Sequence, residues 1–304
     1  MNLLLTGCFK YSEEQMQKLN SLGFSVYFMQ QEKEDLPLAA DEVDAVVCNG
    51  LFLTHDIGKF QRLSFIQLTS VGLDRVPVDK IKERGIELHN ARGVYSVPMA
   101  EWAVFRILEH CKQGGFFRKE QKNCCWTKHR GLRELAGSKI AVVGAGNVGQ
   151  EVAKRFVPFG VKITGFDIHK NETVGFEEMD LTENFRARVS EFDVIVLTAP
   201  LLPSTRGLIN RDVLMNMKQN AMIVNIARGG LIDEKAMCEV LNIRQDLFAA
   251  LDVFETEPLD ETNPLWTMNN VAVSPHNSFV GNGNNKRMFD LMYLNLKRFI
   301  NKSK

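Results

Sequence analysis

The stretch Lys139–Asp167 constrains the fold of this chain more than any other part of the sequence. An apolar run, Ile140–Val143, leads into a G-x-G-x-x-G pattern, then into residues of helical character, and a second apolar run ends at Asp167. Two apolar runs joined through a helix are typical of parallel strands in one sheet. The glycines in this setting predict a doubly wound α/β sheet of the Rossmann type.

The three glycines of the pattern, at positions 144, 146 and 149, suit a bound dinucleotide. The first permits a tight turn, the second lets the backbone approach a pyrophosphate, and the third lets the helix pack closely on the strand. The N-terminus of that helix points unpaired N–H groups at the phosphates. Asp167 can accept hydrogen bonds from the ribose hydroxyls and would repel a 2′-phosphate, which favours NAD over NADP. His169 and Lys170 lie close to Asp167 and keep NADP open, and the alternative is a glycine-rich turn without a ligand.

Composition excludes several other classes of function. The chain has 304 residues, enough for two domains, with 37 basic and 37 acidic side chains. A net charge of zero provides no basic field for nucleic acid or an anionic membrane. No apolar run approaches the roughly 20 residues that span a bilayer. The six cysteines form no C-x-x-C pair, and Cys124-Cys125 with His129 make a poor tetrahedral metal site, so we expect reduced thiols, a cytoplasmic location and no metal.

Alternating strands and helices in the first ninety residues predict a second, smaller parallel α/β unit. Within this unit we expect a short helix that Thr54 caps and that reaches about Leu63. A long amphipathic helix is expected from about Pro98 to Cys111. The stretch Gly114–Leu135 is basic, aromatic and irregular, and two interpretations stay open: a solvated loop, or an arm that contacts a second subunit.

Three polar residues lie in loops at the predicted strand ends after position 139, where ligands of doubly wound sheets bind. Arg228 offers the paired N–H donors that suit a carboxylate. His276 can give and take a proton near neutral pH. Glu257 can fix the tautomer of such a histidine and stabilise its protonated form. Taken singly, each is compatible with an ordinary loop or packing residue, and their shared position favours a site.

Several stretches, in one order along nearly the whole chain, resemble the D-isomer-specific 2-hydroxyacid dehydrogenase family: Thr69–Asp74, Met99–Trp102, Gly144–Gly149, Asn225–Asp233, Leu251–Pro258 and Ser274–Asn277. The resemblance implies hydride transfer between NAD(H) and a 2-oxo or D-2-hydroxy acid. It also implies a discontinuous, flavodoxin-like substrate domain, residues 1–97 plus 277–304, around an NAD-binding Rossmann domain of residues 98–276. Members are usually homodimers.

The resemblance also assigns the site residues. Arg228, Glu257 and His276 take the catalytic positions, and backbone groups of Val71 and Gly72 join Arg228 in holding the substrate carboxylate. The cofactor contacts fall to Gly144, Gly146, Asn147, Val148, Gly149, Asp167, Ala199, Pro200, Thr205, Ile226, Ala227, Asp252 and His276.

Two features narrow the substrate. Glu257 argues against formate, because formate dehydrogenases of this fold carry an amide at that position. The loop Asn49–Leu53 is apolar where phosphoglycerate dehydrogenases place arginines, which favours hydroxypyruvate, glyoxylate or an apolar 2-oxo acid over phosphoglycerate. Arg75, Arg92 and Lys128 keep a phosphate site open. The alternative function is an NAD-sensing interaction protein with little turnover on the same fold.

Overall fold

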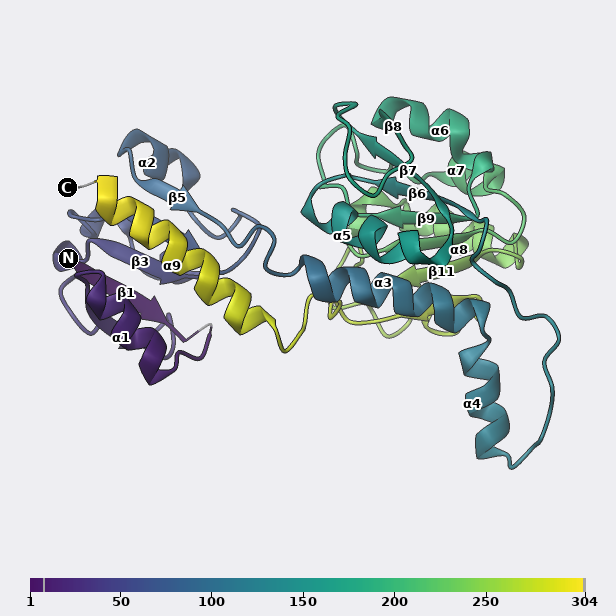
Figure 1. Cartoon of the computed structure of the whole chain (residues 1–304), viewed down its shortest axis with the longest axis horizontal. Coiled ribbons are helices and arrows are strands. Elements are labelled where there is room, and N and C mark those ends of the chain that lie inside the picture. Colours follow the sequence, from purple (N-terminus) through teal and green to yellow (C-terminus); the bar gives the residue numbers. More distant parts are fainter. Residues whose placement is uncertain (8, 303–304) are drawn as a thin grey trace. The chain divides into compact units, whose positions relative to one another are not determined.

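Two parallel sheets organise the chain in the computed structural model, which describes residues 1–7 and 9–302 (Figure 1). The five-stranded sheet belongs to unit 1, made of residues 1–95 and the chain from Gly281 onward. The seven-stranded sheet belongs to unit 2, made of Ser96–Val280. Both sheets carry helices, so the predicted α/β class with a Rossmann-type sheet is confirmed.

Unit 1 has the strand order β2-β1-β3-β4-β5, with every neighbouring pair parallel. Its elements are β1 (Asn2–Thr6), α1 (Glu13–Ser21), β2 (Ser25–Met29), β3 (Ala45–Cys48), β4 (Phe65–Leu68), α2 (Val78–Glu83), β5 (Glu87–His89) and α9 (Asn284–Lys302). One core lies between the sheet and α1 and α9, which contribute Leu19 and Met292. A second core covers the other face and includes Ile81 of α2.

Helix α1 begins at a capping box. The Ser12 hydroxyl accepts a hydrogen bond from the Gln15 N–H at 3.2 Å, and the Gln15 side chain accepts one from the Ser12 N–H at 2.9 Å. This reciprocal capping box satisfies two of the N–H groups that a helix start leaves without partners. It directs the chain from β1 across one face of the sheet.

Unit 2 has the strand order β12-β11-β10-β9-β6-β7-β8, again parallel throughout. Its strands are β6 (Lys139–Val143), β7 (Lys162–Asp167), β8 (Glu178–Leu181), β9 (Val194–Leu197), β10 (Met222–Asn225), β11 (Phe248–Leu251) and β12 (Val271–Val273). Its helices are α3 (Ser96–Cys111), α4 (Gly114–Lys122), α5 (Asn147–Phe156), α6 (Phe185–Arg188), α7 (Arg211–Asn216) and α8 (Glu234–Ile243).

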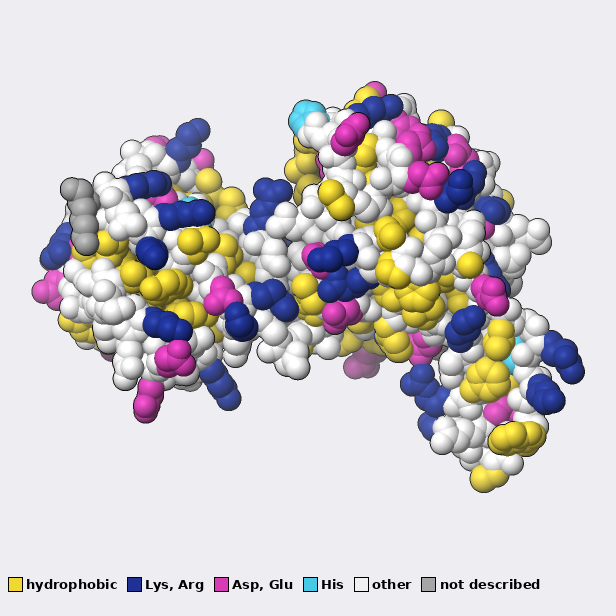
Figure 2. Space-filling model, in the orientation of Figure 1, with side chains coloured by type: hydrophobic (Ala, Val, Ile, Leu, Met, Phe, Trp, Pro, Cys, Tyr) yellow, Lys and Arg dark blue, Asp and Glu magenta, His cyan; other side chains and the backbone are white. Residues whose placement is uncertain are grey.

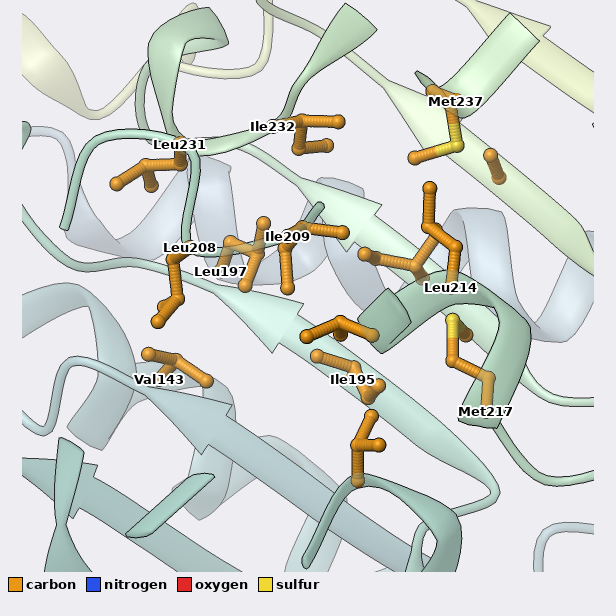
Figure 3. Packing of buried hydrophobic residues seen from close by; sticks show 14 of the residues in the cluster. Val143, Ile195, Leu197, Leu208, Ile209, Leu214, Met217, Leu231, Ile232 and Met237 are labelled. Carbon is orange, nitrogen blue, oxygen red and sulfur yellow. The ribbon is translucent and has the colours of Figure 1, made fainter. Parts of the chain in front are cut away.

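The seven-stranded sheet is apolar on both faces because each face carries helices. On one face, α5 packs on β6 and α3 packs on β10 and β11, and Phe156 and Ile107 belong to the apolar cluster there. On the other face, α6, α7 and α8 cover a cluster that includes Phe166, Leu214 and Met237. Figure 3 shows part of this second cluster, in which Ile195 of β9 lies near Leu214 and Met217, and Leu197 of the same strand lies near Leu208 and Ile209. The central strands are thereby fixed, and their carboxyl ends share one edge.

The prediction of a helix from Thr54 to about Leu63 is wrong. The chain forms one short 3-10 turn before Thr54, Leu51–Leu53, and a second one within the predicted helix, Ile57–Lys59. The second turn begins at Asp56, whose side chain accepts a hydrogen bond from the Gly58 N–H at 3.0 Å. The short side chain of an aspartate commonly hydrogen-bonds to nearby backbone N–H groups. Here that hydrogen bond competes with a continuous helix through the segment.

Two further elements differ from the expectations. The irregular stretch after Gly114 begins with helix α4, while the rest of it to Leu135 contains no helix or strand. Strand β8 was not predicted, because its sequence, Glu-Met-Asp-Leu, contains no apolar run. Strands at sheet edges often carry charged residues in this way. Among the described residues, no helix combines the length and apolar character that crossing a bilayer requires.

Candidate active site

Three predicted site residues follow three neighbouring strands of unit 2. Arg228 comes after β10, Asp252 directly after β11 and His276 after β12. The three strands are in register at their last residues, Asn225, Leu251 and Val273. Adjacent strands lie about 4.8 Å apart, so the strands that carry Arg228 and His276 are roughly 10 Å apart. The fold therefore brings the three loops to one edge of the sheet.

His276 is held from its ring and from its backbone. Its Nδ1 lies 2.7 Å from Glu257 Oε2, and its N–H donates to the Asp252 carbonyl oxygen at 2.7 Å. The residue has a φ of 48°, a left-handed conformation that a non-glycine residue adopts only when its surroundings impose it. Glu257 is fixed in turn, because its Oε1 accepts the Phe254 N–H at 3.1 Å. The imidazole Nε2 makes no hydrogen bond to any described residue, which leaves it available to a reacting group.

The histidine–carboxylate pair is accessible to solvent. The side chain of His276 is 41% exposed and that of Glu257 is 36% exposed. With Nδ1 facing a carboxylate, the proton of a neutral ring sits on Nδ1, and the second proton of the charged ring sits on Nε2. This arrangement can deliver a proton from Nε2 and recover it there.

Asp252 builds the turn that presents His276. It is completely buried, and its carboxylate accepts a hydrogen bond from the Ser274 hydroxyl. The N–H groups of Asn277 and Ser278 also donate to this carboxylate, each at 2.9 Å. A buried carboxylate that accepts several N–H and O–H donors holds those donors in place. Its role beside the nicotinamide remains a prediction, and sequence reasoning missed the part played by Ser274.

Arg228 is exposed and stands on a turn that buried groups fix. The fully buried Asn225 donates from Nδ2 to the Arg228 carbonyl oxygen at 3.0 Å and accepts the Ala227 N–H at 3.1 Å. A side chain on Gly229 would overlap the backbone of Phe254, so this glycine allows the Arg228 turn to pack on the loop that carries Glu257. Sequence reasoning did not identify Asn225, although an asparagine ending an apolar strand is a recognisable signal.

The glycine-rich turn after β6 fits a dinucleotide. Gly144 has a φ of 104° and lies against the backbone of Ala199, and a Cβ on Gly149 would overlap the Gly144 carbonyl oxygen. Around Gly146, by contrast, no atom lies within 4 Å of an added Cβ. Gly146 is the N-cap of α5 and provides no side-chain cap, so the helix start presents open space and its N–H groups. A pyrophosphate is suited to that position.

Asp167 ends β7 beside this turn. Its Oδ2 accepts the Ala145 N–H and its Oδ1 accepts the Ile168 N–H, both at 2.7 Å. The carboxylate is therefore held at the edge of the glycine-rich turn, where the ribose of a bound dinucleotide belongs.

Gly146 and Gly149 should respond differently to an added methyl group. We expect Gly146→Ala to fold with an unchanged Tm, because its φ of −72° suits alanine and the space is open. It should weaken NADH binding by about tenfold or more, since the methyl group occupies the pyrophosphate position. Gly149→Ala should lower the Tm because of the overlap with Gly144. Fluorescence titration with NADH and thermal unfolding measure both effects, and unchanged NADH affinity in Gly146→Ala would contradict this assignment.

The remaining predicted cofactor residues line the same edge. Ala199, Ile226 and Ala227 are nearly buried, and Pro200 is exposed. The Thr205 hydroxyl is occupied within its own turn, since it donates to the Pro200 carbonyl oxygen at 2.7 Å and accepts the Leu202 N–H at 2.8 Å. Asn147 and Val148 begin α5. Cofactor contacts by these residues stay predictions.

In unit 1, Val71 and Gly72 follow β4. The Val71 carbonyl oxygen accepts from Asn90 Nδ2 at 2.8 Å and the Gly72 carbonyl oxygen from the Ser70 hydroxyl at 3.0 Å. The N–H groups of both residues make no hydrogen bond to any described residue. Two adjacent free N–H groups are suited to a carboxylate.

Comparison with known proteins decides the family. The model of the D-isomer specific 2-hydroxyacid dehydrogenase NAD binding domain matches residues 104–278, which is more than half of the chain. The chain belongs to this family. Its members are NAD-dependent oxidoreductases that act on the CH–OH group of 2-hydroxy acids.

Similarity to individual proteins supports the same family. The chain is 40% identical over 257 residues to the hydroxypyruvate reductase of Thermotoga maritima, covering 81% of each chain. It is 38% identical over 249 residues to the D-3-phosphoglycerate dehydrogenase of Methanocaldococcus jannaschii, covering 80% of this chain and 47% of that one. Among solved structures, a D-isomer specific 2-hydroxyacid dehydrogenase family protein from Aeromonas salmonicida matches with a TM-score of 0.82 and 26% identity, over 99% of this chain and 96% of that one.

Proposed function

We propose that this 2-hydroxyacid dehydrogenase reduces a 2-oxo acid to the D-2-hydroxy acid with NADH, with unit 1 as the substrate domain and unit 2 as the cofactor domain. The observation that carries the proposal is the His276–Glu257 pair, held at the same carboxyl edge of the sheet as Arg228 and as the glycine-rich turn after β6. Formate oxidation would need no such pair, since formate releases no hydroxyl proton.

Arg228 is assigned to substrate binding, and His276 with Glu257 is assigned to proton transfer. Bound NADH supplies the hydride for the carbonyl carbon. Arg228 binds the substrate carboxylate with its paired N–H donors and orients the carbonyl group. His276, charged, donates the proton on Nε2 to the carbonyl oxygen, and Glu257 stabilises the charged ring through Nδ1. In the oxidative direction His276 Nε2 accepts the hydroxyl proton. In unit 1 we assign the free N–H groups of Val71 and Gly72 to the substrate carboxylate.

The loop Asn49–Leu53 supports a small or apolar substrate side chain. Glu32 fixes this loop, because its carboxylate accepts the N–H groups of Asn49 and Gly50, each at 2.6 Å. Leu53 is 66% exposed and offers an apolar surface, while the Arg75 side chain lies beside Gly50 of the same loop. The Thermotoga maritima relative is named a hydroxypyruvate reductase. We therefore favour hydroxypyruvate, glyoxylate or an apolar 2-oxo acid over a phosphorylated one.

We also propose a homodimer in the cytoplasm. Helix α4 and the segment that leads to β6 project from the rest of unit 2 (Figure 1), and Figure 2 shows apolar side chains on this arm. Trp126 is 98% exposed there, which is unusual for a tryptophan without a partner surface. Exposed free thiols at Cys124 and Cys125 suit a reducing compartment. Light scattering that gives the mass of a single chain would contradict the dimer.

The test is NADH oxidation against a panel of 2-oxo acids, with NADPH in parallel. The panel contains hydroxypyruvate, glyoxylate, pyruvate, 2-oxoisocaproate, phenylpyruvate and 3-phosphohydroxypyruvate. We expect turnover of one of the first five with NADH, and slower turnover with NADPH. Fast reduction of 3-phosphohydroxypyruvate would overturn the substrate assignment. Tight NADH binding without turnover of any member would favour an NAD-sensing interaction protein instead.

A further inference from the structure

The segment after β7 carries a lysine whose charge is already engaged. Lys170 lies three residues after Asp167, and its Nζ is 2.7 Å from Asp180 Oδ1. The lysine side chain is 52% exposed, whereas that of Asp180 is 8% exposed. A mobile exposed cation is thus paired with a nearly buried carboxylate, which has far less freedom to move.

The Asp180 carboxylate is fixed by several other groups. It accepts hydrogen bonds from the Leu181 N–H and Asn184 Nδ2, each at 2.8 Å, and from Arg188 Nη1 at 2.9 Å. The hydrogen bond from Lys170 is the largest of the effects that hold the pKa of Asp180 well below its ordinary value, followed by the one from Asn184. The carboxylate therefore remains charged throughout the neutral range and can hold the lysine continuously.

Strand geometry places the two carboxylates on different faces of the sheet. Asp180 of β8 is in register with Phe166 of β7, so both side chains point to the same face. That face is the one covered by α6, because Arg188 lies 5.7 Å from the Phe166 ring centroid. Asp167 follows Phe166 directly, so it points to the opposite face, where it accepts the Ala145 N–H.

We propose that Asp180 is a selectivity residue for the cofactor, because it holds the Lys170 ammonium on the α6 face and so keeps it from a 2′-phosphate beside Asp167. A cation in the loop after the acidic residue is what accommodates the phosphate of NADP in this type of sheet. Asp167 repels that phosphate, and Asp180 removes the cation that would offset the repulsion. The inference rests on the proposed preference for NADH.

Isosteric replacement tests the idea. Asp180→Asn keeps an oxygen at the Oδ1 position for the Leu181 N–H and Asn184 Nδ2, and it removes the charge that holds Lys170. Arg188 loses its acceptor at the Oδ2 position but keeps its pairs with Glu178 and Glu191. We expect the Kd for NADPH, from fluorescence titration without substrate, to fall roughly fivefold, the size expected for a partly exposed charge pair. The Kd for NADH should stay unchanged. The gain should shrink at high ionic strength, because salt screens exposed charges.

Three companion variants separate this role from a structural one. Lys170→Met alone should leave the NADPH Kd unchanged, because the engaged lysine contributes nothing to it. The double variant Asp180→Asn/Lys170→Met should return to the wild-type value. Glu178→Gln is the matched control, since Glu178 also pairs with Arg188, at 2.7 Å, and has no contact with Lys170. It should not change the NADPH Kd.

Two results would overturn the inference. One is weaker NADPH binding in Lys170→Met, which would mean that the lysine already reaches the phosphate; this variant answers the question even if Asp180→Asn unfolds. The other is a folded Asp180→Asn protein with an unchanged NADPH Kd. The proposed NADH preference fails separately, if the wild-type protein binds NADPH as tightly as NADH.

Discussion

His276→Asn should lose turnover of the 2-oxo acid by about 10³-fold while its affinity for NADH stays at the wild-type level. Proton transfer by a positioned side chain contributes roughly 10²- to 10⁴-fold to a rate, and an amide cannot deliver the proton that Nε2 carries. Asparagine is preferred to alanine because His276 has a φ of 48°, and asparagine adopts this left-handed conformation more readily. The substitution therefore removes the imidazole with little cost to the backbone.

Stopped-flow or steady-state NADH oxidation measures the rate, and fluorescence titration measures NADH binding. His129→Asn is the matched control, since His129 lies in the arm after α4 and contacts Phe116 rather than any site residue. A His276→Asn rate within tenfold of the wild type would show that another group supplies the proton. A parallel loss of NADH affinity would instead point to damage of the cofactor site.

Arg228→Lys should lower kcat/KM for the 2-oxo acid by roughly 10²- to 10³-fold. Lysine keeps the positive charge but loses the planar fork that donates two parallel hydrogen bonds to a carboxylate, each worth about 1.5–3 kcal/mol. Arg228 Nη1 donates to the Ala227 carbonyl oxygen at 2.7 Å, and the variant changes this one contact. The buried Asn225 still fixes the backbone of the turn, so the loop should keep its shape. NADH affinity and Tm should be unchanged.

Chemical rescue makes this prediction sharper. Added guanidinium should restore part of the activity of Arg228→Ala, since a small cation can occupy the space of the missing fork. Arg211→Lys provides the control, because Arg211 pairs with Glu239 at 2.7 Å on α7 and α8. Unchanged kcat/KM in Arg228→Lys would remove Arg228 from carboxylate binding. Absence of rescue together with a lowered Tm would reveal a structural role.

Elements whose signal lies in neighbouring residues were predicted well. The turn at Gly144 and helix α5 after it depend on a few adjacent residues and on the backbone conformations that they permit. Prediction failed where a local signal was absent or misleading. Strand β8 has no apolar run, and the segment after Thr54 forms only a short 3-10 turn, which Asp56 caps.

The sequence by itself determined the chemistry that the chain carries. It places an acid at the end of the strand after a glycine-rich turn, and an arginine and a histidine a few residues beyond later strands. These positions can be predicted because strand ends and glycine-rich turns are recognisable from short stretches of sequence. Only the tertiary structure decided how these residues are held. Asp252 holds the turn around His276, Gly229 lets the Arg228 turn meet the Glu257 loop, and Asp180 binds Lys170. The physical reason is that such contacts depend on strand order and on which face each side chain occupies. Strand order and facing are set by packing across the whole sheet.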